Sequence, residues 1–244
     1  MKLSIGILFC HVIIVLLSVS LISTCLFASS SFSEEMILAE QGNAENQYNL
    51  GRMYHEGNGV AQNDKKAIKW LTKSAEQGYI YAQIDLGSIY YLGITGSIEQ
   101  NFKEAHNWLQ KAAEQGSVRA QWYLGEMYLF GDGLTKDYKK AIKWLTKSAE
   151  QGQVNAQMWL AQLYSKGEGV GQDYKEAFKW TWMAADQGYP YAQTILGTMY
   201  LNGDGINKDY KEGAKWLSKA AEQGYAQAKQ SLDSLCESIP EACK

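Results

Sequence analysis

The feature that most constrains the fold of this chain is a sequence unit of about 36 residues that occurs five times in tandem. The copies span residues 46–81, 82–119, 120–155, 156–191 and 192–227. The second copy is longer by two residues, and the insertion falls in the segment around Ile94 to Ser97. Self-similarity at a fixed period of roughly 20–50 residues is typical of arrays in which each unit packs only against its neighbours. The sequence therefore predicts one elongated repeat domain rather than a single globular core.

The first half of each copy has the spacing of an amphipathic helix. In the third copy, Ala120 opens the unit, Leu124 follows four residues later, and Tyr128 follows four residues after that. Residues three and four apart lie on one face of a helix, so these positions form an apolar stripe. Gly131 and Gly133 come next, and glycine tolerates the left-handed backbone that commonly ends a helix. We expect a helix of about three turns that ends at these glycines.

A second helix is expected in the other half of each copy. An Asn or Asp precedes it, and such side chains accept hydrogen bonds from the free amides of a helix N-terminus. These capping residues are Asn63, Asn101, Asp137, Asp173 and Asp209. Small residues and one tryptophan recur after them, as at Ala141 and Trp144, and the indole can fill the space beside closely approaching helices. Because a glycine such as Gly152 then ends the segment, each copy predicts two antiparallel helices.

These motifs carry a family resemblance. The pattern A-x-x-x-L-G-x-x-Y-x-x-G-x-G-V, then D-Y-x-x-A-x-x-W, then A-A-E-Q-G is similar to the Sel1-like repeat, a relative of the tetratricopeptide repeat, over residues 46–227. The resemblance implies an all-α fold, a right-handed α-solenoid of antiparallel helix pairs. It also implies a protein-binding scaffold in which the first helices line the concave face.

The first 30 residues have the composition of a secretory signal. They carry one charge, Lys2, before a largely apolar run, and small residues lie near Ser30, where we expect cleavage. Because the apolar run reaches the roughly 18–20 residues that can span a bilayer, an uncleaved anchor is the alternative. The repeats are therefore expected in the periplasm or outside the cell, or anchored at the inner membrane and facing the periplasm.

Short segments on either side of the array are expected to cap it. Residues 31–45 contain the A-E-Q-G motif that closes a second helix, and residues 228–244 restart the pattern of a first helix. Such caps cover the end faces of a repeat stack. Cys236 and Cys243 are the only cysteines after residue 30, and in an oxidising compartment we expect them to form a disulfide. A redox pair or two free thiols are the alternatives.

The sequence contains no motif that predicts catalysis, a cofactor or a metal. It has no G-x-S-x-G, H-E-x-x-H, phosphate-binding loop or dinucleotide fingerprint, and His55 and His106 belong to no cluster with ligand spacing. Cysteine-rich members of the family that these repeats resemble are described as β-lactamases or penicillin-binding proteins. They carry a cysteine pair in each repeat, whereas these five repeats contain no cysteine, and S-x-x-K and K-T-G strings do not occur. We expect no enzyme activity, with such a hydrolase as the alternative.

Positions that vary between the copies predict where a partner binds. Counting each opening residue as zero, positions 2, 6 and 9 face away from the core stripe and positions 3 and 10 flank it. Twelve residues at positions 2, 3, 9 and 10 are apolar or aromatic: Tyr48, Ile84, Tyr91, Leu92, Trp122, Tyr123, Leu129, Phe130, Met158, Trp159, Ile195 and Leu201. Arg52, Glu126 and Lys166 would add polar contacts. Contiguous exposed apolar area marks interaction sites, so these residues predict a protein-binding face. Alternatively, Trp122 and Trp159 belong to the core.

The expected partner is another protein, bound as an extended peptide or a helix. The 23 basic and 26 acidic residues give a net charge of −3 and are interspersed, so the basic cluster expected of a nucleic-acid-binding protein is absent from the sequence. Contact with a membrane is expected only through an uncleaved N-terminal segment. A purely structural role as an envelope spacer is a further alternative.

Overall fold

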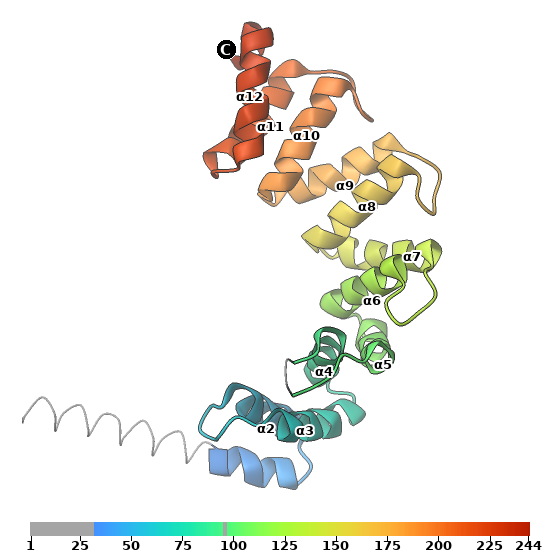
Figure 1. The fold of residues 1–244 in the computed structure, drawn as a ribbon, viewed down its shortest axis with the longest axis vertical. Coiled ribbons are helices and arrows are strands. Elements are labelled where there is room, and N and C mark those ends of the chain that lie inside the picture. The colour runs from blue at the N-terminus through green and yellow to red at the C-terminus, as the bar shows by residue number, and fades with distance from the viewer. Residues whose placement is uncertain (1–31, 95–96) are drawn as a thin grey trace, which may run out of the picture. The chain divides into compact units, whose positions relative to one another are not determined.

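The computed structural model describes residues 32–94 and 97–244, and its described part is built of helices (Figure 1). A helical segment at 32–40 precedes the first complete pair. The first helices of the five pairs are α2 (Ala44–Glu56), α4 (Ile80–Leu92), α6 (Val118–Phe130), α8 (Val154–Lys166) and α10 (Pro190–Asn202). The second helices are α3 (Asp64–Glu76), α5 (Phe102–Glu114), α7 (Tyr138–Glu150), α9 (Tyr174–Asp186) and α11 (Tyr210–Glu222). The chain ends with α12 (Ala226–Ser238) and the 3-10 helix η1 (Pro240–Cys243).

The chain forms two compact units that divide at Lys111, within α5. In the first unit, α2 packs against α3 and α3 against α4; in the second, each helix from α6 to α12 packs against the next along the chain. This consecutive packing of helix pairs confirms the predicted all-α solenoid class. Within the described ranges, no helix is long and apolar enough to span a bilayer.

The predicted N-caps form in all five pairs. The Asp137 side chain accepts a hydrogen bond from the Lys140 backbone amide at 3.0 Å, and the other four capping residues make the equivalent bond. The backbone amide of Asp137 donates in turn to the Tyr128 carbonyl, in the last turns of the preceding helix, at 2.9 Å. Because both bonds recur in each pair, the loop between its two helices is held in the same way each time.

The two helices of a pair approach closely because a glycine meets a leucine. A Cβ atom placed on Gly125 would lie 2.6 Å from Leu145 Cγ, which is closer than real Cβ atoms come to a neighbour. The same contact joins Gly51 to Leu71, Gly87 to Leu109 and Gly197 to Leu217. The fourth pair differs, since Ala161 stands at the glycine position and Thr181 at the leucine position.

A buried glutamine joins consecutive pairs. Gln157, on α8, donates from Nε2 to the Ala149 carbonyl of α7 at 3.0 Å and accepts at Oε1 from Gln187, at the end of α9, at 2.9 Å. It therefore connects three helices from two pairs. Gln47, Gln83, Gln121 and Gln193 make the same bond to an alanine carbonyl eight residues earlier. The role of these buried glutamines was not predicted from the sequence.

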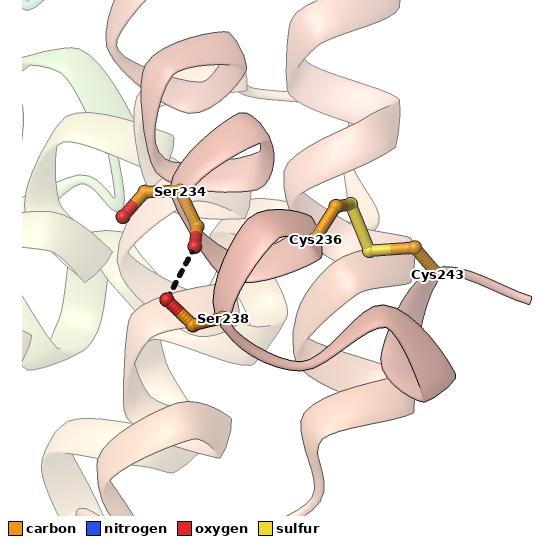
Figure 2. Close-up of a disulfide and its surroundings, with 4 residues drawn as sticks. All are labelled: Ser234, Cys236, Ser238 and Cys243. Carbon is orange, nitrogen blue, oxygen red and sulfur yellow. Dashed lines mark hydrogen bonds between the residues drawn. A yellow bond between two sulfur atoms is a disulfide. The ribbon is translucent and has the colours of Figure 1, made fainter.

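Both described ends of the array are covered by packed segments. In the 32–40 helix, Ala39 is buried with Leu50 and Tyr54 of α2. At the other end, Ala242 of η1 is buried against α11 and α12. A disulfide between Cys236 and Cys243 ties η1 to α12 (Figure 2). The predicted secretory signal lies outside the described residues.

Candidate functional site

A groove of about 690 Å³ lies in the second unit, where α6, α8, α9 and α10 meet. Three consecutive first helices supply most of its wall, and Ala177 and Thr181 of α9 also line it. The volume falls in the range of roughly 300–1,000 Å³ that is typical of ligand sites. The groove therefore lies where the first helices of consecutive repeats come together.

Four of the twelve predicted binding residues line this groove: Trp122, Met158, Trp159 and Ile195. Two of the predicted polar residues, Glu126 and Lys166, line it with them. The two tryptophans are half-buried, so each combines core contacts with an accessible surface. Phe130 is 52% exposed and packs edge-on against Trp159, with ring centroids 5.3 Å apart.

The structure places three predicted surface residues in the core instead. Ile84, Tyr123 and Leu129 are only 8%, 7% and 4% exposed. Leu129 packs with Leu145 of its own pair and with Leu163 of the next. The prediction treated each first helix by itself, whereas an adjoining helix pair covers the flank of α6 that carries Leu129.

The remaining predicted residues are not among those that line the groove. Tyr48 and Tyr91 of the first unit are half-buried, and Leu92 beside them is 68% exposed. Tyr48 contacts Tyr79 and Tyr81 through its ring, with centroids 5.2 and 6.2 Å away. Leu201 packs against the C-terminal core cluster. Of the twelve residues, four therefore line the groove and three are buried in the core.

Glu126, on α6, is a groove residue whose carboxyl pKa is shifted. The Trp159 indole Nε1 donates a hydrogen bond to Glu126 Oε1 at 2.9 Å. Burial raises the pKa of the Glu126 carboxyl above its ordinary value; the Trp159 and Trp122 N–H groups oppose this shift, and the negative charge of Asp132 adds to it. Trp122 Nε1 is itself buried and makes no hydrogen bond of ordinary geometry to the described residues. The geometry therefore gives Glu126 one hydrogen-bond donor, from Trp159.

The charges around the groove do not cancel. Glu126 and Asp204 are acidic, and Lys166 is the one basic residue among those that line it. Lys166 Nζ lies 4.0 Å from Glu168. Among the described residues, Glu126 forms no salt bridge. Its carboxylate therefore lines the groove without a salt-bridge partner in ranges 32–94 and 97–244.

Three tyrosines that line the groove were not predicted from the sequence. Tyr189 and Tyr191 flank the start of α10 and Tyr174 begins α9, and all three side chains are exposed. Tyr189 and Tyr191 lie just before Ala192, the first residue of the fifth copy, so they fall outside positions 2, 3, 9 and 10 of that copy. A Gly-Tyr-x-Tyr string precedes both the second and the fifth copies, and it is the signal that could have found them.

The polar side chains that line the groove include Glu126, Ser165, Lys166 and Asp204. No histidine or cysteine lines it, and the Ser165 hydroxyl donates to the Gln162 carbonyl at 3.0 Å. Across the described residues, no cluster of three or more His, Cys, Asp or Glu side chains is placed to hold a metal. His55 lies in the first unit, where Nδ1 is 2.8 Å from Asp64.

Stacked helix pairs with a groove across their first helices define a helical repeat protein of the solenoid class. The chain belongs to the Sel1 repeat family, whose model matches residues 44–79, 80–117, 118–153, 154–189 and 190–225. Each match begins two residues before the corresponding copy in our alignment. Proteins of this family generally act as scaffolds for protein–protein interaction and are generally not catalysts.

Known structures and relatives agree with this membership. The chain is similar to a Sel1 repeat protein from Oxalobacter formigenes, with 33% identity, a TM-score of 0.72, and coverage of 84% of this chain and 81% of that one. It also resembles c5321, described as a protective antigen of uropathogenic Escherichia coli strains with an SLR fold, with 30% identity, a TM-score of 0.54, and coverage of 85% and 52%. The sel1-like repeat-containing protein L18 of Acanthamoeba polyphaga mimivirus is 48% identical over 48 residues, which are 20% of this chain and 8% of L18. The chain thus spans a small part of the length of such curated relatives.

Proposed function

We propose that this protein is an exported, non-catalytic scaffold that binds a segment of another protein in the groove of its second unit. Family membership supports the general role, because Sel1 repeat proteins typically bind other proteins. The groove supports the specific location, because it is the described site where several predicted binding residues gather. The bound segment is an extended peptide or a helix, the two forms that fit an open groove.

One observation carries this proposal: Trp122 and Trp159, from consecutive repeats, line the same groove while remaining half-buried. Tryptophan is enriched among the residues that contribute most to binding energy, especially where surrounding contacts exclude water. Exposed tyrosines at the N-termini of α9 and α10 line the groove as well. Tyrosine offers a large apolar ring together with a polar hydroxyl, which suits a surface that is alternately free and bound.

Export is part of the proposal, and two features support it. The first 30 residues have the composition of a secretory signal. The Cys236–Cys243 disulfide, at the far end of the chain, is a bond that persists in oxidising compartments. Fractionation of cells that produce the full chain tests this point: recovery in the cytoplasm with the N-terminal residues intact would contradict it.

Binding can be tested with a peptide library displayed on phage and selected against the purified full chain. We expect the selected peptides to lose at least about tenfold in affinity when Trp159→Ala is introduced, because a central aromatic anchor is removed. Trp182→Ala is the matched control, since Trp182 is 43% exposed on α9 and does not line the groove. Helix content measured by circular dichroism should match the native chain in both variants. Equal binding by the two variants would show that the groove is not the binding site.

A further inference from the structure

We infer that the groove recognises a basic side chain, lysine or arginine, in the segment that it binds, and that Glu126 is the residue that pairs with it. This inference rests on the proposed peptide-binding function, and it adds a rule for which peptides bind. Three features of the site support it: the unused bonding capacity of the carboxylate, the cost of leaving its charge unpaired, and the aromatic surroundings.

The first feature is the bonding of Glu126. Its Oε1 accepts the Trp159 indole N–H at 2.9 Å, and the Trp122 indole N–H makes no hydrogen bond of ordinary geometry to the described residues. A carboxylate can accept about four hydrogen bonds. Elsewhere in this unit, Glu176 pairs with Lys179 at 3.1 Å and Glu212 with Lys215 at 3.1 Å, both on exposed helix surfaces. Glu126 thus keeps bonding capacity that these surface carboxylates use within the chain.

The second feature is energetic. A carboxylate removed from water loses hydration, and this loss is costly unless a cation or several hydrogen bonds replace the water. Glu126 is partly buried, one indole N–H contributes a hydrogen bond, and Asp204 adds a second negative charge to the groove lining. A lysine or arginine side chain from a partner would supply the missing positive charge at a site that has already been partly desolvated.

The third feature is the aromatic wall. Trp122 and Trp159 line the groove beside Glu126, and Phe130 packs against Trp159. Aromatic rings attract ammonium and guanidinium groups, and they accommodate the aliphatic part of the same side chains. The chain already shows this preference, since Lys147 Nζ lies 4.7 Å from the Trp144 ring centroid and Lys219 Nζ 3.9 Å from that of Trp216. A long basic side chain therefore fits the groove better than an acidic one, and its charged end reaches a carboxylate.

The test begins with the peptide library selected against the native full chain. Selected sequences are expected to share a lysine or arginine near an apolar residue. The tightest peptide is then synthesised with that position as lysine, arginine, norleucine or citrulline, so that the charge is removed while the length is kept. Affinities are measured for the native chain, for Glu126→Gln, and for Glu150→Gln, which removes the same charge at the exposed end of α7, outside the groove lining.

Glu126→Gln retains an oxygen that can accept the Trp159 N–H, so its fold should be preserved, and circular dichroism checks this. We expect the charged peptide to bind at least about tenfold more weakly to Glu126→Gln than to the native chain, and equally to Glu150→Gln. The neutral peptide should bind the native chain and Glu126→Gln alike. Comparison of the lysine and arginine peptides then shows which cation is preferred.

The failure of this inference differs from the failure of the proposed function. If selected peptides carry no basic residue, or if the charged peptide binds Glu126→Gln as tightly as the native chain while Trp159→Ala weakens it, the charge rule is wrong and the groove still binds peptides. If Trp159→Ala also leaves binding unchanged, the proposed site is wrong as well. A Glu126→Lys variant gives an independent check, since selection against it should enrich aspartate or glutamate in place of the basic residue.

Discussion

The contact that differs in the fourth helix pair allows a sharp test of how the repeats pack. In the other four pairs, a Cβ on the glycine would lie 2.5–2.8 Å from the facing leucine Cγ. Ala161 and Thr181 replace that glycine and leucine, and both are buried. The single substitution Thr181→Leu would bring a leucine against an existing Cβ atom. We therefore expect it to overpack the interface between α8 and α9.

The expected magnitudes follow from these distances. Overpacking a tight contact costs about 1–3 kcal/mol. Ala161→Gly alone should cost about 1 kcal/mol in helix propensity, because glycine is the poorer helix former. The double variant recreates the contact found in the other pairs, so it should lose only the glycine penalty. The effect of the double variant on the free energy of unfolding should therefore differ from the sum of the two single effects by about 1–3 kcal/mol. This difference corresponds to roughly 2–12 °C in melting temperature for a domain of this size.

Thermal and urea denaturation, followed by circular dichroism, measure the stability of the native chain, the two single variants and the double variant. Hydrogen exchange should accompany them, because repeat units contact only their neighbours and can open locally. The third pair supplies the reverse control, in which its glycine and leucine are replaced by the alanine and threonine of the fourth pair. Gly125→Ala should be destabilising by itself and less so together with Leu145→Thr. If the Thr181→Leu and Ala161→Gly effects add to within about 0.5 kcal/mol, the two positions are not in the contact we describe, and the packing argument fails.

Two further predictions concern polar groups. Gln157→Leu removes the hydrogen bonds to Ala149 and Gln187. In urea denaturation, it should have a free energy of unfolding about 1–2 kcal/mol lower than that of Gln162→Leu, the control at an exposed position of the same helix. Equal free energies of unfolding would show that the buried amide contributes nothing. Burial raises the pKa of Glu126, so the folded state holds its proton more tightly than the unfolded state, and stability falls as the pH rises from the unfolded pKa through the folded one. Glu126→Gln should therefore melt at a higher temperature than the native chain at about pH 7 and at the same temperature at about pH 3, where both states are protonated; a lower melting temperature at pH 7 would contradict this sign.

The repeat architecture could be predicted from the sequence because its signals are local and occur five times. The Asp137 cap depends on a side chain and an amide three residues away, and the glycine that follows each helix acts on its own backbone. The burial of Tyr123 and Leu129 could not be obtained in this way, because neighbouring helices cover these side chains. Gln157 shows the same limit, since a polar residue near the start of a helix has no evident role until the ends of α7 and α9 are known to lie beside it.

The groove was predictable in part, and the part that was missed explains its chemistry. Periodicity placed Trp122 and Trp159 on one side of their helices, and the regular stacking of α6 and α8 brought them together. Glu126 was expected only as an exposed polar neighbour, whereas it is partly buried and bonded to Trp159. Its significance arises from that combination, which depends on the distance between two repeats rather than on either repeat alone.

Glu126 differs from the residues of the repeat that stabilise the fold. The Gly125–Leu145 contact and the bonds of Gln121 recur in other copies and improve packing or satisfy buried polar groups, so their presence needs no ligand. Glu126 has the opposite character: its equivalents in the other copies are different residues, and its raised pKa means that the charged form opposes folding. A charge that costs stability at one position of one repeat, beside accessible tryptophans, is best explained by an interaction that the free chain does not contain. That interaction is the one a basic side chain of a bound partner would provide.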